Sequence, residues 1–201
     1  MEKIIDFFRE VGKLKTLKRT GWVVEGVKDP ESIADHSFRT ALAVVVLGKH
    51  KDIDLFKCVK MALAHDIAES QIGDLLVDWK LDAHGEEKLK NLKNREEHGI
   101  TLEEKLKREK DGMKKLTSIL GEDGKELLEL WEEFEDGKTK EAVFVKSVEN
   151  FEMFLQAYEY EESQGVDISS WFNHGNNWRA KDQEINSLIK KIVEKRKEKS
   201  R

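Results

Sequence analysis

The segment ALAHDIAESQIGD, residues 62–74, decides how the rest of the sequence is interpreted. It places His65 beside Asp66, with Glu69 three residues further on, near the end of a predicted buried helix. On a helix of about 3.6 residues per turn, these three side chains lie on one side. Burying an imidazole beside two carboxylates is costly, and a divalent cation compensates because its ligands are imidazole nitrogen and carboxylate oxygen. The alternative is a solvated helix end, since a lone His-Asp pair is weak evidence.

A second histidine, His36, lies in the sequence ADHS at the start of another strongly apolar stretch, residues 35–49. The valine run of this stretch fits a buried strand, but its alanines and its length favour a buried helix. Histidines on two buried helices can face one another, as they do in the metal sites of helix bundles. The alternative for His36 is a core histidine bonded to a backbone carbonyl.

A third acidic position lies on a later helix, where Glu149 and Glu152 interrupt an apolar stripe. Glu149 follows Val145 by four residues, which places it near the inward side of the predicted helix. The alternative is a carboxylate on the flank of the helix that forms a surface ion pair, which is the more common case for a lone glutamate.

The remaining sequence predicts a single all-α domain. Apolar residues recur at helical spacing, and the predicted helices cover residues 2–17, 35–49, 54–71, 101–120, 122–135, 138–164 and 182–199. Residues 18–34 are predicted to form a long ordered loop, and residues 166–180 an aromatic, asparagine-rich loop. Thr101 and Glu104 form a capping-box start. No internal repeat and no clean domain boundary is visible.

Composition excludes several classes of protein. The 201 residues carry 36 basic and 41 acidic side chains, a net charge of −5, which argues against general binding to nucleic acid or to an anionic membrane. The single cysteine, Cys58, excludes a disulfide framework and a multi-cysteine zinc site. No apolar run is long enough to span a membrane, so we expect a cytoplasmic protein.

Five segments in order resemble one family. They are KRTGWV (18–23), DPESIADHSFRTALA (29–43), ALAHDIAESQIGD (62–74), EEKLKREKDGMKKL (103–116) and FVKSVENFEMFLQAYEYE (144–161). Together they resemble the 5′-deoxynucleotidase branch of the HD-domain superfamily of metal-dependent phosphohydrolases. Any one segment would be weak evidence, but their agreement in order and spacing is specific. The resemblance implies a single HD-domain helical bundle over residues 1–201, with a core of about 1–165 and a C-terminal loop and helix at 166–201.

The resemblance also implies a ligand set for one divalent metal ion, which could be Mn, Co, Ni, Zn or Mg. His36, His65 and Asp66 match the first three ligands of the family. Glu149 occupies the fourth position, which is normally an aspartate, and this is a departure from the family pattern. Asp66 and Glu69 match the catalytic positions.

The resemblance to the family also implies which residues bind the substrate. Asp74 matches a residue that contacts the sugar 3′-hydroxyl, while Arg19 and Trp22 resemble the pair that holds the phosphate and the sugar. Lys18 could share the role of Arg19, because here two residues separate Arg19 from the tryptophan. A tryptophan packed where a 2′-hydroxyl would lie disfavours ribonucleotides only modestly.

The implied activity is hydrolysis of deoxyribonucleoside 5′-monophosphates to deoxyribonucleosides and phosphate, by a homodimer that binds neither a membrane nor a nucleic-acid polymer. Two alternatives are an HD hydrolase of another phosphorylated metabolite, such as a cyclic nucleotide or an alarmone, and a non-catalytic HD scaffold.

One segment departs from the family in length. Residues 79–99 are predicted to be a helical insertion, either a lid or dimer element or a passive surface excursion. The other histidines are predicted to be surface residues; they are His50, His84, His98 and His174. The C-terminal aromatic residues could pack on the core or in a dimer, and core packing is the more common case; they are Trp171, Phe172 and Trp178.

Overall fold

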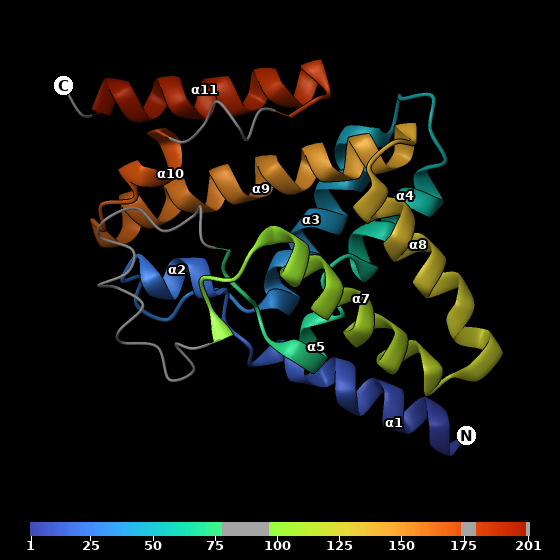
Figure 1. Cartoon of the computed structure of the whole chain (residues 1–201). Helices are drawn as coiled ribbons and strands as arrows, with labels where there is room; N and C mark the ends of the chain where they lie inside the picture. Colours follow the sequence, from blue (N-terminus) through green and yellow to red (C-terminus); the bar gives the residue numbers. More distant parts are fainter. Residues whose placement is uncertain (78–96, 174–179, 200–201) are drawn as a thin grey trace. The chain divides into compact units, whose positions relative to one another are not determined.

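The computed structural model describes residues 1–77, 97–173 and 180–199 (Figure 1). Over these residues the regular structure is helical apart from two isolated β-bridges, Lys18 with Ser32 and Val77 with Ile100, which confirms the all-α prediction. No helix in this part of the chain is long and apolar enough to cross a membrane. The chain divides into two compact units, each described here by itself.

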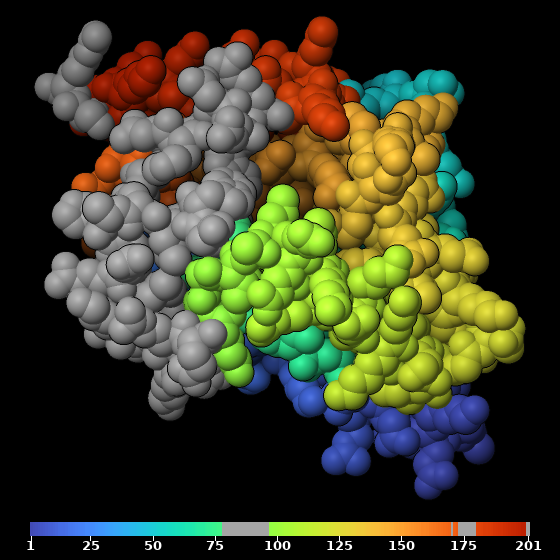
Figure 2. Space-filling model, viewed as in Figure 1, coloured from blue at the N-terminus to red at the C-terminus, as the bar shows by residue number. Residues whose placement is uncertain are grey.

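Unit 1 comprises Met1–Asp35 and His65–Glu132. Its elements are α1 (Glu2–Val11), η1 (Gly12–Lys15), α2 (Thr20–Val24), α5 (Glu69–Ile72), α7 (Leu102–Ser118), η4 (Gly121–Gly124) and the first part of α8 (Lys125–Asp136). Helix α5 packs against α7, and α1 contacts both of them. Gly112 permits this close packing, because a Cβ atom there would lie 3.2 Å from Ile72 Cγ2 and 3.3 Å from the Ala68 carbonyl oxygen. The outer side of α7, green to yellow-green in Figure 2, lies on the surface.

Unit 2 comprises His36–Ala64 and Glu133–Arg201. It contains most of α3 (Ile33–Gly48), α4 (Leu55–Ala64), the end of α8, α9 (Lys140–Gln164), α10 (Ser169–Asn173) and α11 (Gln183–Lys199). Helix α9 packs against both α4 and α11. The core includes Val44, Met61, Phe144, Val145, Val148 and Ile185.

The helix predicted over residues 54–71 is interrupted, so the prediction of one continuous helix was wrong. Helix α4 ends at Ala64, residues 65–68 form a turn, and the short α5 follows. The backbone N–H groups of residues 69–71 donate to carbonyls three residues earlier, at 2.9–3.1 Å. Such tight hydrogen bonds are typical of a 3₁₀ turn, and the spacing of apolar residues does not distinguish that turn from an α-helical one.

Other boundaries differ less. The predicted first helix is α1 followed by η1, and the stretch with the valine run is helical, as α3, rather than a strand. The loops predicted at 18–34 and 166–180 contain the short helices α2 and α10, which the glycines and asparagines concealed. Thr101 caps α7 as predicted, because its side chain accepts from the Glu104 N–H at 3.1 Å.

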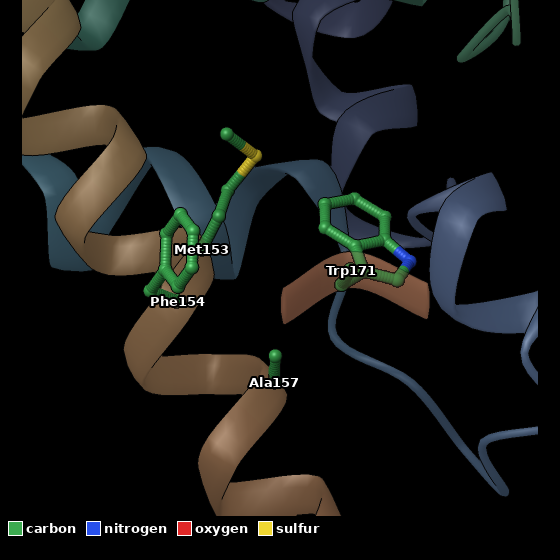
Figure 3. A pocket seen from close by; sticks show the side chains of 4 residues that line it. All are labelled: Met153, Phe154, Ala157 and Trp171. Carbon is green, nitrogen blue, oxygen red and sulfur yellow. The ribbon is translucent and has the colours of Figure 1, made fainter. Parts of the chain in front are cut away.

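Most of the predicted insertion at 79–99 lies outside the described residues, and so do His84, His174 and Trp178. His50 is exposed as predicted, whereas His98 is half-buried and its Nδ1 accepts from the backbone N–H of Leu76 at 3.4 Å. The prediction that the C-terminal aromatic residues pack on the core is confirmed for Phe172, which packs against the core cluster of unit 2. Phe172 meets Phe154 edge to face with ring centroids 5.6 Å apart, and Trp171 of α10 faces Met153 and Ala157 of α9 across a small apolar cavity (Figure 3).

Candidate functional site

Arg19 is positioned in unit 1 by a short antiparallel pairing of the chain before α2. The backbone N–H of Arg19 donates to the Glu31 carbonyl at 3.1 Å, and that of Ile33 donates to the Leu17 carbonyl at 2.9 Å. The Arg19 side chain then donates from Nη1 to Asp66 Oδ2 at 3.1 Å, and both side chains are largely buried. The pairing therefore brings a guanidinium group to the turn that contains His65 and Asp66.

Asp74 fixes the start of α2 from the other direction. Its Oδ2 accepts from the backbone N–H of Thr20 at 2.7 Å, and the Thr20 hydroxyl donates to the Asp74 carbonyl at 2.8 Å. Trp22, on the same short helix, is 1% exposed, and its Nε1 donates to Glu31 Oε1 at 2.9 Å. Arg19, Trp22 and Asp74, which the sequence grouped as substrate-binding residues, thus lie on one hydrogen-bonded framework.

Lys18 follows a different course from Arg19. Its Nζ donates to Asp29 Oδ1 at 2.9 Å and to the Pro30 carbonyl at 2.7 Å, within the loop that precedes α3. These bonds direct the side chain along the loop, while Arg19 turns to Asp66.

Glu69 is the buried acid of unit 1. It is 3% exposed, and its Oε2 has no hydrogen-bond partner among the described residues. Burial raises the pKa of the Glu69 carboxyl well above its usual range, and the charges of Asp74 and Asp66 raise it further. A carboxyl whose pKa is raised in this way takes up a proton more readily than an exposed one and can exchange it with a reacting group.

The positive charges of Arg19 and Lys105 lie near these carboxylates and partly compensate their negative charges. Burial alone would lower the pKa of Arg19, but the charges of Asp74 and Asp66 outweigh it and leave that pKa above its usual range. Lys105 of α7 behaves similarly, because the charges of Glu109 and Asp74 outweigh the effect of burial and raise its pKa. Both side chains therefore remain charged.

Sequence reasoning missed Lys105. Its side chain is 19% exposed, and its Nζ lies 3.3 Å from Glu109 Oε1, one turn further along the helix. A lysine and a glutamate four residues apart look like an ordinary surface pair in a charged helix, so the sequence contains no signal for the buried role.

Among the described residues, each unit brings a predicted histidine ligand close to a predicted carboxylate ligand. In unit 1, His65 is 3% exposed and its Nε2 lies 3.2 Å from Asp66 Oδ2. In unit 2, His36 is fully buried, and one of its ring nitrogens lies within 4.8 Å of a carboxylate oxygen of the half-buried Glu149. Imidazole nitrogen with carboxylate oxygen is a donor set that first-row divalent cations accept, so the residues present fit such an ion.

Sequence reasoning also missed the partners of His36. Its Nδ1 lies 2.5 Å from Oε2 of Glu152, which is 1% exposed. Arg39 donates from Nε to the other oxygen of Glu152 at 2.8 Å. Burial raises the pKa of Glu152, but the charges and hydrogen bonds of His36 and Arg39 outweigh it and lower that pKa overall. The signal available in the sequence was Glu152 itself, three residues beyond Glu149 inside an apolar stripe.

Comparison with known proteins shows the family to which the chain belongs. Residues 11–192 match the family described as HD domain, and the chain belongs to that family, whose members are metal-dependent phosphohydrolases. A Dictyostelium discoideum protein named 5′-deoxynucleotidase HDDC2 is 45% identical over 170 residues, which cover 81% of this chain and 80% of the relative. The human protein of the same name is 41% identical over 79% of this chain and 69% of the relative.

Solved structures show the same fold. A conserved hypothetical protein from Pyrococcus furiosus has a TM-score of 0.69 and 29% identity, covering 94% of this chain and 99% of that chain. A predicted metal-dependent phosphohydrolase from Magnetospirillum magnetotacticum has a TM-score of 0.67 over 96% of this chain and 93% of that chain, and its 21% identity supports the fold alone.

Proposed function

We propose that this chain is a divalent-metal-dependent 5′-deoxynucleotidase that hydrolyses deoxyribonucleoside 5′-monophosphates to deoxyribonucleosides and phosphate. The observation that carries the proposal is the buried cluster of unit 1, where Glu69 lies under the electrostatic influence of Arg19, Asp66 and Asp74. These are the positions that the family resemblance assigns to proton transfer, phosphate, metal and sugar. Relatives named 5′-deoxynucleotidase, up to 45% identical, support the same activity.

In this proposal His36, His65, Asp66 and Glu149 bind one divalent cation. When bound, such a cation supplies positive charge to the phosphoryl group and lowers the pKa of a neighbouring water molecule. Glu149 differs from the usual aspartate by one methylene but offers the same carboxylate. The match of the HD domain family to residues 11–192 spans both units, which supports treating residues 1–201 as one HD domain.

Arg19 and Lys105 supply the positive charge that the chain itself brings to the phosphate. A guanidinium group binds two phosphate oxygens with a planar fork, whereas an ammonium group acts as a point charge. Because the net charge of the protein is −5, an anionic substrate depends on such local cations rather than on long-range attraction. Lys18 is the weaker candidate, since it is bonded to Asp29.

Glu69 handles the proton in this scheme. Water attacks phosphorus, the bond from phosphorus to the 5′-oxygen breaks, and the leaving oxygen needs the proton that the water loses. A buried carboxyl with a raised pKa and an oxygen that has no partner among the described residues is suited to transfer that proton.

Asp74 and Trp22 select the sugar. Asp74 is 8% exposed and accepts a backbone hydrogen bond at one oxygen, so its carboxylate is oriented before a 3′-hydroxyl binds. Trp22 is held by Glu31 and would exclude a 2′-hydroxyl by shape. Exclusion by shape alone gives about 10–200-fold discrimination, so some hydrolysis of ribonucleotides is expected.

The test is metal removal and replacement. The protein is treated with a chelator, Mn²⁺, Co²⁺, Ni²⁺, Zn²⁺ or Mg²⁺ is added back singly, and phosphate release is measured from deoxy- and ribonucleoside 5′-monophosphates. Release that depends on metal and favours the deoxy substrates supports the proposal. Hydrolysis of a cyclic nucleotide or an alarmone in place of every 5′-monophosphate would contradict it.

We further infer that the protein forms a homodimer through the apolar face of α3, defined by Phe38, Leu42, Val45 and Val46, which are 44–68% exposed. Their spacing places them on one side of the helix, and an exposed apolar stripe of this kind marks an interaction surface. A second copy is the proposed occupant, because two copies of one face bury each other symmetrically.

The solution mass tests the homodimer. Val46→Lys is expected to give a monomer, while Ile5→Lys, an exposed apolar residue of α1, is expected to leave the dimer intact. A dimer that survives Val46→Lys contradicts the proposed face.

A cytoplasmic location is also proposed. It is supported by the cysteine content, because Cys58 is the single cysteine of the sequence and has no second cysteine in the chain with which to form a disulfide. Fractionation of cells that produce the protein is the test.

A further inference from the structure

Glu152 bridges a histidine and an arginine in the interior of unit 2. Its side chain is 1% exposed and that of His36 is 0% exposed, so neither group has appreciable contact with solvent. The Nδ1 of His36 lies 2.5 Å from Glu152 Oε2, and the Nε of Arg39 donates to Glu152 Oε1 at 2.8 Å. Both oxygens of Glu152 are therefore hydrogen-bonded by side chains of α3, whereas Glu152 itself lies on α9.

Arg39 is held at all three of its nitrogens by α9. Besides the bond to Glu152, its Nη2 donates to Gln156 Oε1 at 2.5 Å and its Nη1 donates to Glu159 Oε2 at 2.6 Å. These acceptors lie about one turn apart along one face of the helix. The guanidinium is thus fixed in position, and its charge compensates a buried carboxylate that would otherwise be costly.

This arrangement fixes which nitrogen of His36 faces a ligand. A carboxylate at Nδ1 favours the tautomer with a proton on Nδ1, because that proton forms the bond to Glu152. Nε2 then presents its lone pair for coordination. Carboxylates that contact the second nitrogen of a ligating histidine orient the ring and increase its basicity in metalloproteins.

We propose that Glu152, held by Arg39, is a positioning residue that sets the tautomer and ring orientation of His36 for metal binding. The inference rests on the proposed function, in which His36 is a ligand, and adds residues that the ligand set does not include. Glu152 acts through His36 rather than as a ligand itself, because each of its oxygens already has a protein partner.

The first test needs no metal, and its decisive arm uses the wild-type protein. Long-range ¹⁵N–¹H correlation spectra of the metal-free protein identify which imidazole nitrogens carry protons. A proton on Nδ1 of His36 is expected, and Glu152→Gln is expected to shift the Nδ1 resonance. A His36 ring whose Nδ1 carries no proton in the wild-type protein overturns the inference.

The second test is metal affinity, measured by titrating the metal-free protein with Mn²⁺ in a calorimeter. Glu152→Gln keeps the size of the side chain but removes the charge, and the affinity is expected to fall about 10–100-fold. The matched control is Glu161→Gln on the same helix, which removes a carboxylate paired with Arg196 at 2.5 Å and is expected to leave the affinity unchanged. Thermal unfolding of the metal-free variants separates this loss from a loss of folding.

The outcomes distinguish the two proposals. Wild-type protein that binds Mn²⁺, with Glu152→Gln binding it equally well, overturns the role of Glu152 and leaves the proposed function standing. Wild-type protein that binds none of the divalent cations named above overturns the proposed function and this inference together. If Glu152→Gln does not fold, Arg39→Gln replaces it and is expected to lower the affinity in the same direction; unchanged affinity in that variant contradicts the proposal.

Discussion

Arg19 and Asp66 are 47 positions apart in the chain, yet the Nη1 of Arg19 donates to Asp66 Oδ2 at 3.1 Å. The proposed phosphate-binding residue is therefore paired, before substrate binds, with a carboxylate that is a proposed metal ligand. A phosphate that binds Arg19 would take over part of this interaction. Substrate binding and metal binding are thus expected to influence each other, because they share one hydrogen-bonded pair.

Glu69→Gln is expected to lower kcat by about 10²–10⁴-fold, because the variant cannot transfer a proton at this position. Metal affinity is expected to change little, since Glu69 is not among the proposed ligands. Phosphate release and Mn²⁺ titration of the same preparation check both statements. Near-normal turnover in Glu69→Gln would show that the proton is handled elsewhere.

Lys105→Gln is expected to lower kcat/KM for a deoxyribonucleoside 5′-monophosphate by about 10–100-fold, the loss of one hydrogen bond to a charged group. Lys107→Gln is the matched control, because Lys107 is an exposed lysine on the same helix, and it is expected to behave as wild type. An equal kcat/KM in the two variants would show that Lys105 does not contribute to phosphate binding.

Glu149→Asp is expected to retain metal binding, since aspartate is the usual residue of the family at this position. Glu149→Ala removes the carboxylate and is expected to weaken Mn²⁺ binding by more than about 10-fold, as loss of even an indirect metal partner does. Calorimetric titration of both variants is the measurement. If the alanine variant binds Mn²⁺ as tightly as wild type, Glu149 is not a ligand.

Asp182 stabilises the start of α11 in a manner that depends on pH. Its carboxylate accepts from Lys51 Nζ at 2.9 Å and from the backbone N–H of Ile185 at 3.1 Å. Burial raises the pKa of Asp182, but these bonds outweigh it and lower the pKa overall, so the carboxylate stabilises the fold above its unfolded pKa. This stabilisation is lost as the pH falls through the folded pKa.

Asp182→Ala is therefore expected to lower the free energy of unfolding by about 1–2 kcal/mol at neutral pH. The difference from wild type is expected to shrink below about pH 4, where the unfolded carboxyl takes up a proton. Urea unfolding of the variant and the wild type, at neutral pH and below about pH 4, measures this difference in the free energy of unfolding. A difference that stays constant across this range would mean that the charge of Asp182 contributes nothing.

The sequence predicted most helices, because its apolar residues recur at a spacing that only a helix places on one buried face. It did not predict the turn at residues 65–68. A turn with hydrogen bonds to carbonyls three residues earlier keeps nearly the same spacing of apolar side chains as an α-helix. The ligand and substrate positions followed from motifs that include His36 and Asp74. Whether those residues bind a metal or a sugar stays a prediction.

What the sequence could not supply was the set of partners contributed from distant segments. Glu152 contacts His36 across 116 positions, and nothing local to either residue encodes that pairing. Lys105 is similar, because the charges of Asp74 and Glu69 that act on it come from a distant part of the chain. Charge and burial at such positions arise from tertiary packing, whereas a motif records only residue type and spacing.

Phosphate release by the metal-reconstituted protein tests the central claim most directly. Deoxyadenosine 5′-monophosphate and deoxyadenosine 3′-monophosphate are compared, because they carry the same base, sugar and phosphate and differ in where the phosphate is attached. Metal-dependent release from the 5′-isomer, with little or none from the 3′-isomer, is the predicted result. Absence of release from the 5′-isomer with every one of the five cations would contradict the account.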